Sequence, residues 1–198
     1  MTSTNLTARA VWGLLLAGMM LAAPRADAAF LQLTPATSTV EEGATFALAL
    51  GIGGLAVDPR QLLGGLTLDL QFDPGRVSFV AAEFALREFG DVDPADPFDD
   101  PLVDAAAADG VLSLFALSLL TGSDALAAAQ TGGAFRVATL IFRAIGSGAD
   151  GAVFGFGATS AVDFDGARLE IAGPERAAVV SIVAGDGAHA VPEPGPLS

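Results

Sequence analysis

The chain has 198 residues, with 23 acidic residues, 9 arginines and no lysine, and a formal net charge of −14. Nucleic-acid binding requires clustered cations, so this charge balance predicts no nucleic-acid partner. The absence of cysteine excludes disulfides and thiolate metal sites, and stability must therefore come from an apolar core.

Residues 1–28 have the pattern of a secretory signal peptide. Arg9 follows the amino terminus, and the apolar stretch from Val11 to Ala23 is shorter than the roughly 20 residues that a membrane helix needs. The small residues of Ala26-Asp27-Ala28 predict cleavage between Ala28 and Ala29. We therefore expect an exported protein, extracellular, periplasmic or at the cell surface; an uncleaved anchor is the alternative. Cleavage would leave 7 Arg against 22 acidic residues, a net charge of −15.

Residues 29–184 are predicted to form an all-β domain, because short segments alternate between apolar and polar residues and are separated by Gly, Asp and Pro. The densest apolar run has ten residues and predicts no stable membrane span in the mature chain. About nine strands are expected, which favours an antiparallel β-sandwich. In chain order these strands are Phe30–Leu33, Phe46–Ile52, Leu66–Phe72, Val77–Val80, Val111–Leu120, Phe135–Ile145, Val153–Phe156, Arg168–Ile171 and Ala177–Val183.

The segments between the strands have their own signals. Short helices are predicted for Ala81–Phe89, which is rich in helix formers, and for Asp124–Gln130, with Asp124 as the N-cap. Asp73-Pro74-Gly75 predicts a hairpin-type turn. Residues 90–110 are expected to form a long loop rich in Asp, Pro and Ala, and residues 185–198 a flexible tail.

The order of several motifs is similar to that of cohesin-like domains, especially those of PEP-CTERM proteins. The motifs are Val40-Glu41-Glu42-Gly43-Ala44-Thr45-Phe46, the run from Leu66 to Pro74, Val77-Ser78-Phe79, Gln130, Phe135, and the run from Val137 to Ala144. The likeness covers roughly residues 30–183. It implies a nine-stranded jelly-roll sandwich related to some carbohydrate-binding modules, with a dockerin-like protein or a polysaccharide as the ligand.

The tail contains a second motif, Pro192-Glu193-Pro194, which together with the signal peptide resembles the sorting signal of PEP-CTERM proteins, a group of exported bacterial proteins. The resemblance implies that an exosortase-type enzyme reads Pro192, Glu193 and Pro194. In that family an apolar helix and a basic cluster follow the motif, whereas this sequence stops at Ser198. Export without membrane retention is the expectation for the tail as it stands.

Clustered aspartates in the 90–110 segment offer the oxygen ligands that calcium prefers. Asp91, Asp93 and Asp96 are the candidate metal ligands, although Pro94 and Pro97 break the spacing of an EF-hand loop. A solvated acidic loop without a cofactor is the favoured interpretation. A second candidate is the segment Asp163-Phe164-Asp165-Gly166, for which a turn anchored by aspartate is favoured.

Signatures of catalysis are missing from the sequence. The single histidine, His189, lies in the tail, and no serine nucleophile elbow or P-loop occurs. The Gly-rich segments 51–54 and 155–157 lack the last glycine of a dinucleotide fingerprint and are interpreted as bends. No enzyme is expected; a glycosidase with paired carboxylates is a remote alternative.

Phenylalanine is the only aromatic residue available to stack on a sugar in the mature chain. Four rings in alternating strands are predicted to belong to the core: Phe72, Phe79, Phe135 and Phe142. The four outside that pattern are candidate carbohydrate-binding residues: Phe84, Phe89, Phe98 and Phe164. The sequence thus predicts a non-catalytic exported module for binding or adhesion at the envelope or in extracellular matrix, with a strict carbohydrate-binding module as the alternative.

Overall fold

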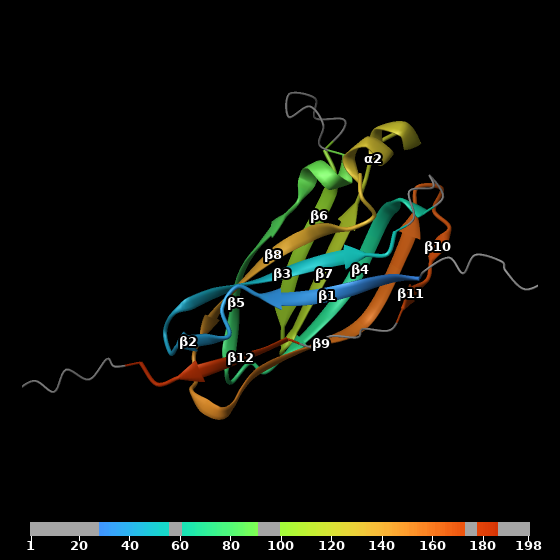
Figure 1. The fold of residues 1–198 in the computed structure, drawn as a ribbon. Coiled ribbons are helices and arrows are strands. Elements are labelled where there is room, and N and C mark those ends of the chain that lie inside the picture. The colour runs from blue at the N-terminus through green and yellow to red at the C-terminus, as the bar shows by residue number, and fades with distance from the viewer. Residues whose placement is uncertain (1–27, 56–60, 91–99, 173–177, 186–198) are drawn as a thin grey trace, which may run out of the picture.

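A computed structural model describes residues 28–55, 61–90, 100–172 and 178–185, which form two sheets packed face to face (Figure 1). One sheet, named the β1 sheet, has the order β11 (Ile171–Ala172), β1 (Ala29–Pro35), β3 (Thr45–Gly53), β8 (Phe135–Ala144), β5 (Val77–Phe84). The other, named the β4 sheet, has the order β2 (Thr39–Glu41), β12 (Ala178–Val183), β9 (Gly148–Asp163), β4 (Leu63–Phe72), β7 (Val111–Leu117), β6 (Leu102–Ala108), with β10 (Arg168–Leu169) paired to β9.

Neighbouring strands are antiparallel except for two short contacts, in which β11 runs parallel to β1 and β2 runs parallel to β12. The predicted antiparallel β-sandwich is therefore confirmed. Two short helices, η2 (Leu86–Phe89) and α2 (Ser123–Ala129), lie together at one end of the sandwich, and β2 and β12 lie towards the other (Figure 1). No helix in the described ranges is long and apolar enough to cross a membrane.

The expectation of a continuous loop over residues 90–110 is wrong for its second half, which forms the edge strand β6. β6 pairs with β7 along its whole length, from Leu102 opposite Leu117 to Ala108 opposite Val111. The two residues between them, Asp109 and Gly110, have φ values of 50° and 80°. Two central residues with positive φ are the signature of a tight type I′ hairpin, for which Asp-Gly is a strong sequence signal. Alanine has little strand propensity, so pairing with β7 decides the conformation of β6.

Both predicted helices differ in detail from the structure. β5 continues through Phe84, and only Leu86–Phe89 turns into a 3₁₀-helix. Pairing of Ala81–Phe84 with β8 outweighs the helix propensity of these alanines. At α2 the N-cap is Gly122, and Asp124 lies inside the first turn without capping it.

The predicted turn at Asp73 is confirmed, but it joins the two sheets instead of closing a hairpin. The backbone N–H of Gly75 donates to Asp73 Oδ1 at 2.8 Å, and those of Arg76 and Val77 donate to the Asp73 carbonyl oxygen at 3.0 Å. The turn carries the chain from β4 to β5, and so places consecutive apolar strands on opposite sides of the core.

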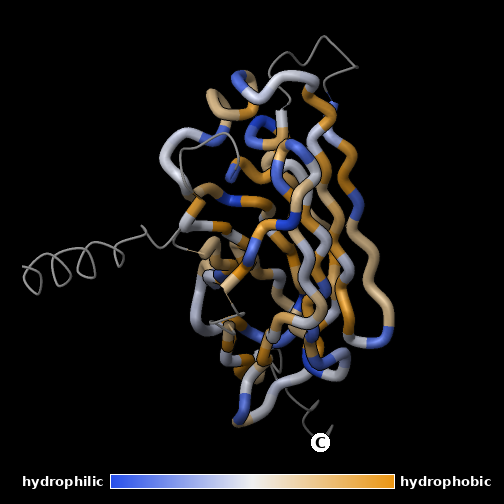
Figure 2. Tube along the Cα trace, turned by 90° about the vertical axis from the view of Figure 1, so that its right-hand side faces the viewer, coloured by the Kyte–Doolittle hydropathy of each residue, from blue (hydrophilic) through white to orange (hydrophobic). Residues whose placement is uncertain are grey.

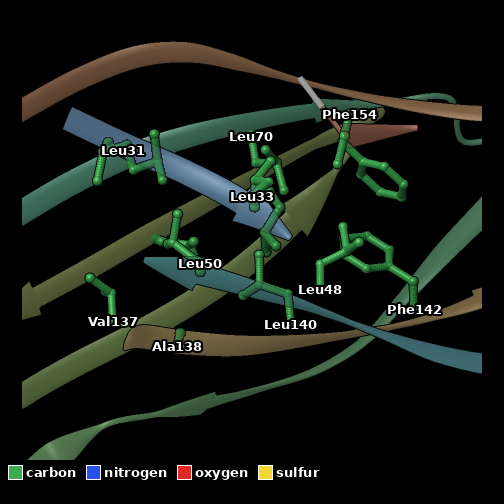
Figure 3. Packing of buried hydrophobic residues seen from close by; sticks show 14 of the residues in the cluster. Leu31, Leu33, Leu48, Leu50, Leu70, Val137, Ala138, Leu140, Phe142 and Phe154 are labelled. Atoms are coloured by element: carbon green, nitrogen blue, oxygen red, sulfur yellow. The ribbon is translucent and has the colours of Figure 1, made fainter. Parts of the chain in front are cut away.

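Alternation along the strands builds the interior. Leu66, Leu68 and Leu70 of β4 are buried, and Figure 3 shows Leu48 and Leu50 of β3 pointing towards the opposite sheet. Coloured by hydropathy, the strands change repeatedly between apolar and polar positions along their length (Figure 2). This pattern is what a strand with one buried face produces.

Phe142 lies at the centre of an aromatic cluster between the sheets. Its ring centroid is 5.0 Å from that of Phe154, 5.4 Å from Phe72, 5.7 Å from Phe79 and 6.1 Å from Phe46. Phe142 is fully buried, as predicted, while Phe72, Phe79 and Phe135 are half-buried and pack against the core.

A buried glutamine holds the helical end of the sandwich. Gln130 follows α2 and is only 5% exposed. Its Oε1 accepts a hydrogen bond from the Leu63 N–H at 2.8 Å, and its Nε2 donates to the carbonyl oxygens of Leu63 at 2.8 Å and Glu88 at 3.0 Å. One side chain thus ties α2 to β4 and η2, and satisfies backbone groups that the fold removes from water.

Candidate functional site

The outer face of the β4 sheet carries an exposed apolar cluster. Strand register places Leu117 between Leu102 and Gly65, with Val162 on the far side of Gly65. The next row contains Phe115, whose ring is 39% exposed, while Leu102 is 53% exposed. We name Leu102, Phe115, Leu117 and Val162 the apolar patch.

Because Gly65 has no side chain, the side chains of Leu117 and Val162 on either side of it come close together. A Cβ atom on Gly65 would lie 3.1 Å from Val162 Cγ2 and 3.2 Å from Leu117 Cδ1, so the two side chains occupy the space above the glycine. The result is a continuous apolar surface across β6, β7, β4 and β9, instead of isolated exposed side chains. Contiguous apolar surface of this kind marks interaction sites more often than scattered residues do.

Polar side chains continue the same face beyond the patch. Ser113 Oγ donates a hydrogen bond to Asp69 Oδ1 at 2.7 Å, and Asp104, Thr67 and Ser160 share the row of Phe115. An apolar centre beside hydrogen-bonding groups is the usual composition of a protein–protein interface.

The outer face of the β1 sheet has a different composition. Gln32 and Arg136 lie on either side of Gly51 in one row, and the Gln32 amide covers the glycine, with Nε2 3.3 Å from where a Cβ would stand. These residues line a hollow of about 230 Å³ together with Thr34 and Ala49. One row further, the ring of Phe30 lies over Gly53, with Cζ 2.6 Å from the position of a Gly53 Cβ.

The rings that the sequence selected for stacking are mostly not at the surface. Phe89 is fully buried and packs edge-on against Phe135, with centroids 5.9 Å apart, so it is not available to a sugar. Phe84 is half-buried against the core and Phe164 is half-buried, while Phe98 lies outside the described residues.

Among the described residues, the exposed rings are instead those of Phe30 and Phe115, for which the sequence predicted strands but no face. For Phe115, the alternation of its strand could have predicted the outward direction of the ring. Phe115 alternates with buried Leu114 and Ala116, so the strand period directs it outwards with Ser113.

The predicted metal ligands Asp91, Asp93 and Asp96 lie outside the described residues, as do Pro192, Glu193 and Pro194 of the tail motif. Asp163 is the turn anchor that the sequence favoured: its Oδ1 accepts a hydrogen bond from the Ala167 N–H at 2.7 Å. Within the described part of the chain, no three His, Cys, Asp or Glu side chains gather where they could hold a metal ion.

No family model matches the sequence, and no curated protein matches it. Solved structures with a similar fold include cohesin modules. The cohesin module of a family 33 glycoside hydrolase from Clostridium perfringens has 12% identity and a TM-score of 0.59, over 80% of this chain and 99% of that one. A type I cohesin–dockerin complex from Clostridium thermocellum has 17% identity and a TM-score of 0.57, over 82% and 99%.

A non-cellulosomal cohesin from the hyperthermophilic archaeon Archaeoglobus fulgidus also matches, with 12% identity and a TM-score of 0.53, over 81% of this chain and 96% of that one. All three likenesses extend over nearly the whole neighbouring chain, so they concern one complete module and not a shared fragment. The protein thus has the β-sandwich fold of cohesin modules.

Proposed function

We propose that this protein is a non-catalytic binding module that receives a dockerin-like protein on the outer face of its β4 sheet. The fold supports the class of function, because one similar structure is a cohesin–dockerin complex. The observation that carries the choice of face is the apolar patch, where Phe115 and Leu102 stay exposed beside hydrogen-bonding side chains.

The composition of this face indicates what the partner should present. Burial of an exposed aromatic ring in an interface contributes strongly to affinity, so Phe115 is the expected centre of the contact. Asp104 lies in the same row as Phe115 and Asp69 in the next row of this face, and both carboxylates favour a partner with Lys or Arg around an apolar centre.

Binding to a displayed panel of dockerin modules tests the proposal. The full chain is compared with the variant Leu102→Asp/Phe115→Asp, which places charge in the patch, and with the matched control Val80→Asp, an exposed valine on the β1 sheet. We expect saturable binding of at least one dockerin, weakened at least tenfold by the patch variant, about 1.4 kcal/mol, and unchanged by the control.

Absence of binding across the panel, or equal loss in both variants, would contradict the proposal. Circular dichroism of each variant keeps misfolding from being mistaken for lost binding.

We further propose that the module works outside the cytoplasm, in assembly or adhesion at the envelope or in extracellular matrix. Support comes from the signal-peptide pattern ending at Ala28 and from Pro192-Glu193-Pro194. Mass spectrometry of exported material should find Ala29 as the first residue, and no peptide containing Trp12.

Sorting by an exosortase-type enzyme is tested separately, by adding an apolar helix and an Arg cluster after Ser198. Processing of this fusion in a host with the enzyme should depend on Pro192-Glu193-Pro194. Equal processing after all three are changed to Ala would contradict the role of the motif.

A further inference from the structure

We infer that the outer face of the β1 sheet is a second binding site, for a linear polysaccharide that carries carboxylate groups. This site is independent of the dockerin-like partner, because it lies on the opposite side of the sandwich. Strands β1, β3 and β8 carry the three features of this site: two arginines, a hollow between side chains, and an exposed aromatic ring.

The charge of this face is opposite to that of the protein. The chain has 23 acidic residues against 9 basic ones, yet β1, β3 and β8 contain no acidic residue. β8 contributes two arginines with exposed side chains, Arg136 and Arg143. The only acidic residue in the strands of this sheet, Glu83, is exposed on the edge strand β5 and pairs with Thr139 of β8, in a row between those of the two arginines.

Both guanidinium groups are available to a ligand. Neither Arg136 nor Arg143 forms an ion pair or a side-chain hydrogen bond with any residue in the described ranges. Their partners in register on β3 are Gly51 and Thr45, six positions apart, which corresponds to about 20 Å along the strand. Guanidinium groups bind carboxylates with two parallel hydrogen bonds, so the pair suits a polymer with repeated carboxylates.

The surface beside Arg136 is hollowed, and small and polar side chains line it. Gly51 and Ala49 form the floor of the 230 Å³ hollow, and Gln32 and Thr34 stand on its far side from Arg136. The amide and hydroxyl groups can donate and accept hydrogen bonds, as sugar hydroxyls require. A chain that reaches both arginines therefore passes over Ala49 and Ala47 of β3, beside Ile141 of β8.

Phe30 provides a ring beside the hollow. Because one side of the ring rests on the backbone at Gly53, the remaining 39% exposure leaves an aromatic surface open to solvent. An aromatic ring with an apolar surface, next to polar groups, can stack on the apolar face of a sugar.

An acidic peptide fits this face less well. Extended peptides usually bind by adding a strand to a free sheet edge. β8 is already paired on both sides, with β3 and β5, so the backbone around Arg136 and Arg143 has no free edge to offer. Recognition must use side chains, which suits a polymer of hydroxyls and carboxylates.

The net negative charge does not prevent this contact at physiological salt. At 0.15 M ionic strength charges are screened over about 8 Å, and packed sheets are about 10 Å apart. The carboxylates of the β4 sheet are thus largely screened from a ligand that touches Arg136 directly.

The test uses polygalacturonate and its fully methyl-esterified form, titrated into the full chain at 0.15 M NaCl with EDTA, so that calcium cannot bridge carboxylates. The variant Arg136→Gln/Arg143→Gln is compared with Arg87→Gln/Arg168→Gln, which removes the same charge at exposed positions off this face. We expect at least tenfold weaker binding for the first variant, less than a twofold change for the second, and at least tenfold weaker binding of the ester.

Several results would overturn the inference: no binding of polygalacturonate, equal binding of the ester, or equal loss in the two double variants. Tighter binding of poly-L-glutamate than of polygalacturonate would assign the face to acidic peptides instead. If the arginine variant does not fold, as judged by thermal melting, Phe30→Ala replaces it, with an expected loss of at least threefold.

Discussion

The two outer faces of the sandwich differ although both sheets contribute to one core. The β1 sheet has two arginines and one acidic residue, whereas the strands of the β4 sheet carry one arginine and a larger acidic set: Glu41, Asp69, Asp104, Asp150 and Asp163. The β1 face has a ring resting on glycine beside a polar hollow, and the β4 face has an apolar patch.

The difference follows from the strand period of two. Alternate residues of each strand are committed to the shared interior, where only size and apolarity matter. The outward-facing residues are not constrained by the core, so one core can support two unrelated surfaces. Each face can therefore have its own ligand.

The largest expected effect comes from the interior that the faces share. Phe142→Ala removes a fully buried ring that contacts Phe72 and Phe154 from the β4 sheet and Phe46 and Phe79 from its own. We expect a loss of about 3–5 kcal/mol in the free energy of unfolding, measured by urea titration. Ligand binding by both faces should be lost together near the lowered urea midpoint of unfolding. A loss of unfolding free energy below about 1 kcal/mol would show that the two sheets do not share this cluster.

A smaller effect is expected at the helical end. Gln130→Ala removes the partners of the Leu63 N–H, the Leu63 carbonyl and the Glu88 carbonyl. Unsatisfied buried groups predict a loss of about 1–3 kcal/mol, with faster amide exchange at Leu63. Gln71→Ala, an exposed glutamine on β4, is the control and should leave both measurements unchanged.

The smallest effects on stability are expected from substitutions on the two faces themselves. Their effects on ligand binding distinguish the two sites. Phe115→Ser and Arg136→Gln should each change the unfolding free energy by less than about 0.5 kcal/mol, because both side chains are exposed. Phe115→Ser should weaken only the dockerin, and Arg136→Gln only polygalacturonate, both by titration. Loss of both ligands in either variant would mean that the faces are not independent.

Local sequence determined the strands, the interior and one turn. Leu66, Leu68 and Leu70 are buried as their alternation predicts, Phe142 is in the core, and the Asp73 carboxylate and carbonyl close the turn. These features depend on neighbours within a few residues, which is why the pattern of one segment was enough.

Tertiary pairing decided the rest. β6 exists because its alanines meet β7, and Ala81–Phe84 is a strand because it meets β8. Both candidate faces also depend on pairing: Gln32 and Arg136 become neighbours only because β1 and β8 lie on either side of β3. Residues so distant in the chain share no local pattern, so only the packed sheets place them in one site.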